Sequence, residues 1–278
     1  MRISIITVNF NNKDGLEETI KSVISQPPKL YEYIIIDGGS TDGSVDVIKK
    51  YSQHIHYWVS EKDKGIYHAM NKGIAVATGD YCNFLNSGDT YHDSLVLSKL
   101  AQSSDGLGGV LIGDVININE KTGRKTQWIS PQKMSMKSLY ISTPNHQASF
   151  FPTEIIKQRG YNLKYKMLGD FDLFMYCFIQ KNICYHKLDF LVVDYQLGGF
   201  SASNEILYSK ERNEILHEYL PDRVIDDYET LLHPKDRFGI RTLYLEKYNR
   251  GMLKIAGVIL EALALPVRLQ NFIKAKYL

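Results

Sequence analysis

The sequence predicts an α/β fold, with a mostly parallel sheet flanked by helices and a helical C-terminal extension. Apolar runs of strand character alternate with segments of helical periodicity over the first half of the chain. Two of these runs stop at acids: Tyr33–Ile36 leads into Asp37, and Tyr81–Leu85 leads into Asn86-Ser87-Gly88-Asp89. From residue 204 onward the pattern is largely helical.

The expected elements of the first half follow one another in a regular order. Ile3–Val8 is typical of a buried strand, and the amphipathic segment Gly15–Ser25 predicts a helix that ends before Pro27-Pro28. The next elements alternate in the same way: strand Tyr33–Ile36, helix Ser44–Tyr51, strand His56–Val59, helix Ile66–Ala77 and strand Tyr81–Leu85. Strands joined by helices favour parallel pairing with right-handed crossovers.

The pattern is less regular after Asp89. The expected elements there are a helix over Leu95–Gln102, a strand pair over Val110–Asn119 and Lys125–Ile129, strands over Ala148–Phe151 and Phe190–Tyr195, and a helix over Gly169–Gln180. Prolines interrupt the later helices at Pro221, Pro234 and Pro266. We therefore divide the chain into a catalytic domain, residues 1–203, and a helical extension, residues 204–278.

Composition limits the possible partners and compartments. With 278 residues, 44% hydrophobic and 23% charged, the chain is typical of a soluble globular protein. A net charge of +2 is no sign of nucleic-acid binding. Cys82, Cys177 and Cys184 lie in apolar surroundings and favour buried free thiols in a reducing compartment. With no signal-peptide pattern and no apolar run long enough to span a bilayer, we expect a cytoplasmic protein.

The acids that end the strands are candidates for ligand contacts, because open α/β sheets bind ligands at the carboxyl ends of their strands. The glycines after Asp37 allow a base or ribose to come close. Asp42 either contacts the ligand or caps the helix that starts near Ser44. Asp89 suits Mg²⁺ or Mn²⁺, which prefer oxygen ligands and combine one or two carboxylates with substrate phosphates. A turn or a cap before Leu95 is the structural alternative.

The charged loop before the helix at Ile66 is a candidate phosphate or base site. Lys64 and the backbone N–H groups at the helix start would face such a ligand. A solvated turn with Asp63 as the helix cap explains the same residues equally well. His68 is either a residue of the helix face or a ligand-binding residue.

Several of these motifs, taken together, resemble glycosyltransferase family 2. In order they are Ser4–Asn11, Ile36–Ser44, Asp63–Tyr67, Ala69–Gly73 and Leu85–Asp89. The similarity extends over roughly residues 3–200 and is closest to bacterial enzymes that build exopolysaccharide, O-antigen or capsule repeat units. It implies a GT-A fold and an inverting, metal-dependent transfer of a sugar from a UDP- or GDP-linked donor to a hydroxyl of a glycan or polyprenyl-linked acceptor.

The resemblance also implies roles for individual residues. Asp37 would read the base of the nucleotide. Asp89 would hold Mg²⁺ or Mn²⁺ as the second acid of a DxD motif, although Asn86 stands where the first acid is expected. The residues that would bind the donor are Thr7, Asn9, Asp37, Gly39, Asp63, Lys64, Asn86, Ser87 and His146.

Gly169-Asp170-Phe171-Asp172-Leu173 resembles the family's Glu-Asp-x-Asp-Leu segment, with Gly169 in place of the glutamate. By this match Asp170 is the general base. A sugar hydroxyl is a weak nucleophile, so a carboxylate must take its proton as the new bond forms. A helix N-terminus keeps such an acid ionised. The alternative is that Asp170 caps the helix while Asp172 or neither acid performs the chemistry.

Three further segments allow two interpretations each. His146 orients the acceptor or touches the diphosphate, or else makes a structural hydrogen bond. Gly198–Ser201 is a loop that closes over the donor, or a simple turn. The basic, amphipathic end from Met252 onward suits an anionic membrane surface, or it packs on the catalytic domain or on a second subunit of a homodimer.

Two other functions compete with the transferase. A sugar nucleotidyltransferase shares the nucleotide-binding architecture but usually carries a glycine-rich phosphate loop after its first strand, which Asn9–Lys13 lacks. A non-catalytic module of the same fold would bind the nucleotide and release none from a sugar donor.

Overall fold

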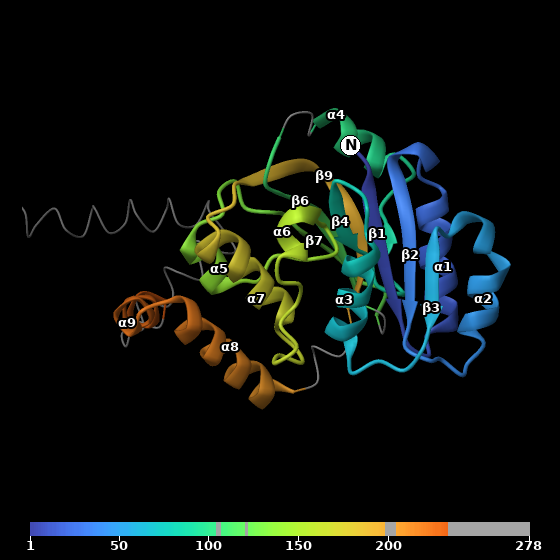
Figure 1. Ribbon diagram of the computed structural model, residues 1–278. Coiled ribbons are helices and arrows are strands. Elements are labelled where there is room, and N and C mark those ends of the chain that lie inside the picture. Colours follow the sequence, from blue (N-terminus) through green and yellow to red (C-terminus); the bar gives the residue numbers. More distant parts are fainter. Residues whose placement is uncertain (104–106, 120–121, 198–203, 233–278) are drawn as a thin grey trace, which may run out of the picture. The chain divides into compact units, whose positions relative to one another are not determined.

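A computed structural model describes residues 1–103, 107–119, 122–197 and 204–232 (Figure 1). The first compact unit of the chain spans Met1–Tyr219, and the second starts at Leu220. The second unit contains helix α9, Asp222–Leu232. Across the described ranges, every helix is too short or too polar to cross a membrane.

One sheet runs through the first unit, in the strand order β3-β2-β1-β4-β8-β6-β9-β5, with β7 paired to β6. The four strands β3, β2, β1 and β4 are parallel to one another, whereas β8 runs antiparallel to both β4 and β6. The strands are β1 (Ile3–Asn9), β2 (Tyr31–Asp37), β3 (Tyr57–Ser60), β4 (Tyr81–Phe84), β5 (Thr90–Tyr91), β6 (Val110–Asn119), β7 (Lys125–Trp128), β8 (Ser149–Pro152) and β9 (Tyr185–Leu197).

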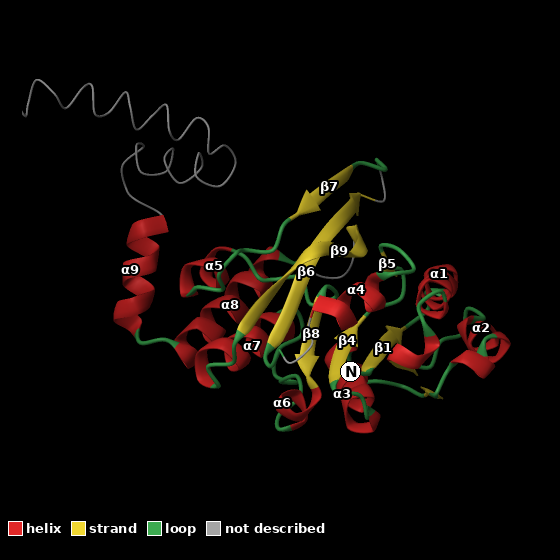
Figure 2. Ribbon diagram, turned by 90° about the horizontal axis from the view of Figure 1, so that it is seen from above, coloured by secondary structure: helices red, strands yellow, loops and turns green. Residues whose placement is uncertain are grey.

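Helices cover both faces of this sheet (Figure 2). On one face, Leu16 of α1, Val47 of α2 and Leu97 of α4 join the strand residues of a single hydrophobic core. On the other face, Gly73 of α3 lies directly against Ile6 of β1. The helices of the first unit are α1 (Lys13–Ile24), α2 (Ser44–Lys50), α3 (Ile66–Val76), α4 (Val96–Ser103), α5 (Met136–Ile141), α6 (Thr153–Lys157), α7 (Gly169–Met175) and α8 (Glu205–Tyr219).

The structure confirms the expected α/β class and refines several elements. The sheet is parallel in its first half and mixed beyond β4, because β8 and β5 run against their neighbours. The helix expected over Gly169–Gln180 is α7 followed by a π-helical turn, Tyr176–Gln180. The expected burial of all three thiols is wrong for Cys184, which is exposed after that turn. Burial raises the pKa of the Cys82 thiol to about 11.

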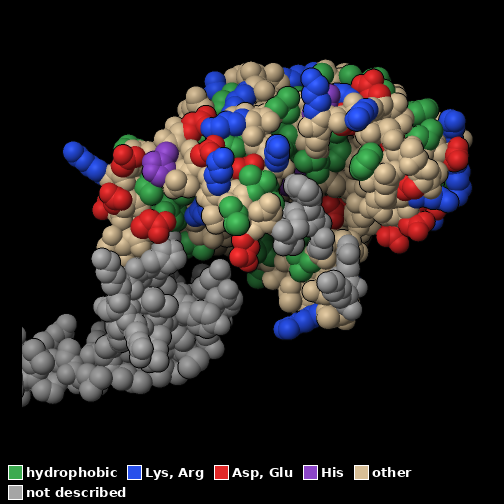
Figure 3. Space-filling model, turned by 90° about the horizontal axis from the view of Figure 1, so that it is seen from below, with side chains coloured by type: hydrophobic (Ala, Val, Ile, Leu, Met, Phe, Trp, Pro, Cys, Tyr) green, Lys and Arg blue, Asp and Glu red, His purple; other side chains and the backbone are tan. Residues whose placement is uncertain are grey.

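The expected boundary between residues 203 and 204 adjoins residues outside the described ranges, and it stays a prediction. Helix α8, which follows it, belongs to the first compact unit. On the face shown in Figure 3, lysine and arginine side chains are interspersed with acidic ones rather than gathered in one patch.

Candidate active site

The expected donor-binding residues meet at the carboxyl ends of β1, β2 and β4. Asn9, the last residue of β1, pairs in register with Asp37, the last residue of β2. The loop after β4 joins the same edge, because the Ser87 amide donates to the Val8 carbonyl at 3.2 Å. Thr7 is fully buried, and its hydroxyl donates to the Leu85 carbonyl at 2.7 Å. The parallel first half of the sheet thus brings these separate motifs together.

The Asp37 carboxylate is buried and hydrogen-bonded by its own surroundings. It accepts from Asn9 Nδ2 at 2.7 Å, from Ser40 Oγ at 2.6 Å and from Ser60 Oγ at 2.6 Å. The backbone amide of Gly39, which has φ +82°, donates to it at 3.2 Å. Burial alone would raise the pKa of Asp37, but these hydrogen bonds lower it below its ordinary value. Asp37 is therefore ionised, and its carboxylate fixes the loop that follows β2 through hydrogen bonds.

Asp42 and His68, for which the sequence allowed either a structural or a ligand-binding role, both have partners within the protein. Asp42 accepts hydrogen bonds from the Ser44 amide at 3.0 Å and from the Lys13 amide at 2.8 Å, so it fixes the starts of α2 and α1. His68 Nδ1 lies 3.0 Å from Asp63 Oδ1, on the loop before α3. Lys64, in the same loop, is exposed. The charged loop is therefore organised around Asp63.

The turn that carries Asp89 is held from several elements. Gly88 has φ +102°, a backbone conformation that favours glycine, and the Asp89 amide donates to the Asn86 carbonyl at 3.0 Å. Thr19 of α1 accepts from the Gly88 amide and donates to the Asp89 carbonyl at 2.7 Å. This bracing explains why the short strand β4 can end in a sharp, fixed turn.

The Asp89 side chain is only 5% exposed, and donors from two other segments reach it. Gln147 Nε2 donates to Oδ2 at 3.0 Å, and the Gln196 amide of β9 donates to Oδ1 at 3.2 Å. The Gln147 and Gln196 donors are both neutral, so neither of them cancels the negative charge of the carboxylate.

His146 connects this turn to α7. Its Nε2 lies 3.4 Å from Asn86 Nδ2, and its Nδ1 lies 3.4 Å from Asp170 Oδ2. The Asn86 Oδ1 atom is buried and accepts no hydrogen bond within the described structure. The three side chains come from a strand end, a loop and a helix start, and they form a continuous polar path across the site.

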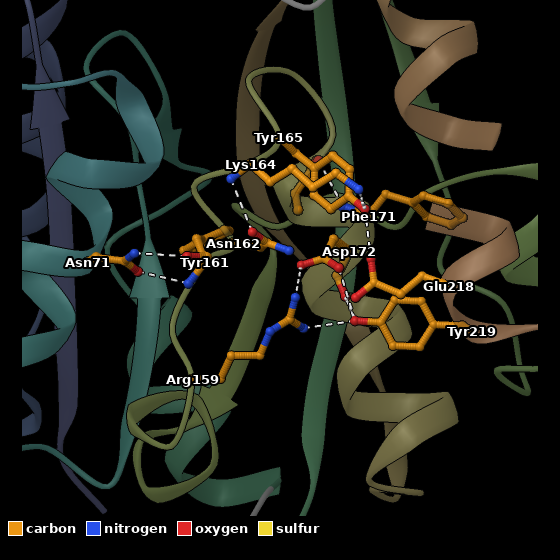
Figure 4. Close-up of polar contacts among 11 residues, drawn as sticks. Asn71, Arg159, Tyr161, Asn162, Lys164, Tyr165, Phe171, Asp172, Glu218 and Tyr219 are labelled. Atoms are coloured by element: carbon orange, nitrogen blue, oxygen red, sulfur yellow. Dashed lines mark hydrogen bonds and ion pairs between the residues drawn. The ribbon is translucent and has the colours of Figure 1, made fainter. Parts of the chain in front are cut away.

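The two acids of α7 differ in their surroundings, although two positions separate them. Asp172 is fully buried and forms an ion pair with Arg159 (Figure 4). Its Oδ1 accepts from the Tyr219 hydroxyl of α8 at 2.9 Å. Burial raises the pKa of Asp172, while Arg159 and Tyr219 act in the opposite direction. The Asp170 side chain, by contrast, is 21% exposed next to His146. Asp172 thus stabilises the fold, and Asp170 is the acid of this pair that can reach a ligand.

Gly169 has a steric reason to replace the expected glutamate. A Cβ atom at this position would lie 2.7 Å from the Tyr67 ring, closer than real contacts allow. The Tyr67 hydroxyl donates to the Met167 carbonyl at 2.8 Å, which fixes the ring beneath the start of α7. The departure from the motif is therefore matched by an aromatic residue on α3.

Glu211 of α8 fixes the segment that leads into α7. Its carboxylate accepts from the backbone amides of Lys166 at 2.8 Å, Met167 at 3.0 Å and Leu168 at 2.9 Å. The glutamate is only 5% exposed. The sequence analysis missed this contact, together with Arg159, Thr19 and Gln147, because no local motif links these positions to the site.

Comparison with known proteins identifies the family. The sequence model of Glycosyl transferase family 2 matches residues 4–205. The chain belongs to glycosyltransferase family 2. This membership confirms the resemblance drawn from the motifs and, with it, the expected glycosyltransferase class.

The relatives of this family 2 chain cover only part of its length. An uncharacterized glycosyltransferase of Mycobacterium tuberculosis is 34% identical over 178 residues, which are 60% of this chain and 65% of that protein. The match thus spans slightly less than two thirds of that relative. A PGL/p-HBAD biosynthesis glycosyltransferase of Mycobacterium bovis is 27% identical over 209 residues, which are 71% of this chain and 78% of the relative.

A solved structure shares the fold. Residues 1–349 of S. aureus TarS, in complex with UDP-GlcNAc, match this chain with a TM-score of 0.62 at 17% identity. The match covers 79% of this chain and 71% of that one. The expected GT-A architecture is confirmed.

Two expectations concern residues outside the described ranges. The loop at Gly198–Ser201 and the basic end from Met252 onward lie there. Closure over the donor, docking at a membrane and contact with a second subunit therefore stay predictions.

Proposed function

We propose that this chain is an inverting, metal-dependent glycosyltransferase that moves a sugar from a nucleotide-diphosphate donor to a hydroxyl of a glycan or lipid-linked acceptor. The polar path from Asn86 through His146 to Asp170 carries the proposal. It joins the sheet edge, where the nucleotide is expected, to an acid that a ligand can reach. The UDP-GlcNAc named with the TarS structure supports a nucleotide sugar as the donor.

Asp170 would take the proton of the acceptor hydroxyl in this reaction. A positioned general base typically accelerates such a transfer by about 10²–10⁴-fold. His146, within 3.4 Å of the Asp170 carboxylate, would hold it in place. The acceptor oxygen would then attack the anomeric carbon from the face opposite the nucleoside diphosphate, which gives inversion.

The residues around Asp89 suit a divalent cation. Asp89 offers a carboxylate, and the unpartnered Oδ1 of Asn86 offers a neutral oxygen, both preferred by Mg²⁺ and Mn²⁺. Across the described ranges no three acidic, histidine or cysteine side chains gather as a complete metal site. One carboxylate combined with the donor's own phosphates is a common arrangement for these ions. Such a cation would neutralise charge on the departing diphosphate.

A thermal-shift screen of nucleotide sugars with and without Mn²⁺ tests the proposal. A true donor binds the folded protein and raises its melting temperature. At a hundredfold excess over Kd, binding adds about 2.7 kcal/mol to the free energy of unfolding. Asp89→Asn should remove the Mn²⁺-dependent part of the shift, whereas Asp189→Asn, at an exposed position of β9, should keep it.

Release of nucleoside diphosphate from the donor found in this screen then distinguishes a transferase from a non-catalytic module. Binding without release would contradict the catalytic proposal. A chain that responds to no nucleotide sugar would contradict donor binding itself.

A further inference from the structure

Helix α3 contacts the segment between α6 and α7 through two side chains of one face. Tyr67 and Asn71 lie four positions apart, so both point to the same side of the helix. The Tyr67 hydroxyl donates to the Met167 carbonyl at 2.8 Å. Asn71 binds both backbone groups of Tyr161: its Nδ2 donates to the carbonyl at 2.9 Å, and its Oδ1 accepts from the amide at 2.8 Å (Figure 4). The segment is therefore fixed to α3 near its start and near its end.

The same two elements also pack closely against each other. Tyr67 and Tyr161 stack with 5.1 Å between ring centroids, and the Tyr161 ring meets Phe84 of β4 edge-on, also at 5.1 Å. Tyr67 is 7% exposed and Tyr161 is 2% exposed. A Cβ atom on Gly160 would lie 2.6 Å from Asn71 Oδ1, closer than real contacts allow. Buried, stacked rings with so little free space hold the segment at one distance from α3.

The position of Asp170 depends on this segment. Met167 lies two residues before α7, which begins at Gly169, so a shift of the Met167 backbone would move the first turn of the helix with it. Glu211 of α8 holds the Met167 amide at 3.0 Å, and Tyr67 of α3 holds the Met167 carbonyl. The peptide units on both sides of Met167 are thus fixed by two different helices, three residues before Asp170.

Helix α3 also holds the charged loop that precedes it. Lys72 Nζ lies 2.6 Å from Asp63 Oδ1, and His68 Nδ1 lies 3.0 Å from the same atom. His68 and Lys72 follow Tyr67 and Asn71 by one position each, so they leave the helix on a neighbouring side. One pair of side chains therefore binds the loop, and the adjacent pair binds the segment that leads into α7.

We propose that Tyr67 and Asn71 are positioning residues for the sugar transfer, which set the place of the Asp170 carboxylate without taking part in donor binding. The inference rests on the proposed role of Asp170 as the general base. Both side chains bind backbone groups of the segment before α7. Burial raises the pKa of the Tyr67 hydroxyl, so this group stays protonated and able to donate. Because small displacements of a catalytic group lower turnover strongly, loss of either contact should reduce turnover rather than donor affinity.

Tyr67→Phe tests the assignment, because it removes the hydroxyl and keeps the stacked ring. Turnover is measured as release of nucleoside diphosphate from the nucleotide sugar that gives the largest thermal shift with Mn²⁺. The Kd of the same nucleotide sugar is measured on the same protein. Turnover should fall about tenfold, whereas Kd should stay within about twofold of the wild type. Asn71→Ala, which frees both backbone groups of Tyr161, should show the same separation.

Tyr81→Phe is the matched control. The Tyr81 hydroxyl also donates to a backbone carbonyl at 2.8 Å, that of Leu107, but Tyr81 lies at the start of β4, at the opposite edge of the sheet. This variant should keep the turnover of the wild type. A second comparison places Tyr67→Phe in the Asp170→Asn background. There it should lower the residual turnover by less than about twofold, because the carboxylate that Tyr67 positions is gone.

A Tyr67→Phe protein with the turnover of the wild type, or one that loses donor affinity as strongly as turnover, would overturn the inference. A fall of about tenfold that recurs in the Asp170→Asn background, or in Tyr81→Phe, would overturn it as well, since it would show a general loss of structure and not a displaced base. An Asp170→Asn protein with normal turnover would instead remove the proposed general base, and the positioning role with it.

Discussion

The sheet edge and helix α7 hold their acids in different ways. At the edge, Asp37 and Asp89 accept hydrogen bonds from neutral donors, and most of the donors to Asp37 lie within a few residues of the strand ends. In α7, Asp172 is paired with a guanidinium and with a tyrosine from α8. Its neighbour Asp170 stays accessible next to His146. The acids of the edge keep their charge, whereas Asp172 of α7 is paired with a cation and held by a tyrosine of α8.

This difference indicates a division of labour. Neutral donors leave negative charge at the edge, where a cation and a diphosphate are proposed to bind. The ion pair of Asp172 neutralises its charge and anchors α7, so that Asp170 can be presented at a fixed position. Each region can be disturbed by itself, and the effects should separate.

Replacement of Arg159, the charge partner of Asp172 in α7, should have the largest effect on stability. Arg159→Met leaves the buried Asp172 carboxylate without its charge partner, which should lower the free energy of unfolding by about 3 kcal/mol. Urea denaturation measures this change. Lys187→Met, which breaks the pair with the exposed Asp189, should change stability by less than about 0.5 kcal/mol. Equal effects of the two variants would show that the buried pair does not anchor α7.

Loss of the hydrogen bonds from the segment before α7 to Glu211 of α8 should reduce turnover more than it weakens donor binding. Glu211→Gln places an amide N–H group against backbone donors, which should cost about 2 kcal/mol of stability and reorient the start of α7. We expect turnover to fall about tenfold, since small displacements of catalytic groups are costly. Kinetics and donor titration together measure both quantities.

The control for this brace is Glu214→Gln, which changes a surface glutamate of the same helix that pairs with Lys164. It should behave like the wild type. If Glu211→Gln weakens donor binding as strongly as turnover, then α8 supports the sheet edge as well as α7.

The smallest effect should appear at Asp37 and should depend on pH. The folded protein lowers the pKa of this acid, so its contribution is present above the unfolded pKa and is lost as the pH falls through the folded pKa. Asp37→Asn should lose about 1.5 kcal/mol at pH 7, and the difference from wild type should shrink below about pH 4. Thermal unfolding across this range measures it. A constant difference down to pH 3 would show that the charge of Asp37 is not involved.

The parts of the site that are local in sequence could be predicted. The acids at the ends of β2 and β4 follow apolar runs directly, and parallel pairing then brings them to one edge. The roles of Glu211 and Arg159 could not be predicted in this way. Glu211 lies more than 40 residues beyond the amides that it binds, and only the packing of α8 brings them together. The mixed pairing in the second half of the sheet could not be predicted either, because β8 pairs on both sides with strands that are distant in sequence.

Asp170 is the point where the two regions meet, so its variant gives the most direct test. In Asp170→Asn, turnover measured by release of nucleoside diphosphate at saturating donor should fall about 10²–10⁴-fold. The donor Kd measured on the same protein should stay within about twofold of the wild type, because the sheet edge is untouched. Turnover near that of the wild type would contradict the assignment of Asp170 as the general base.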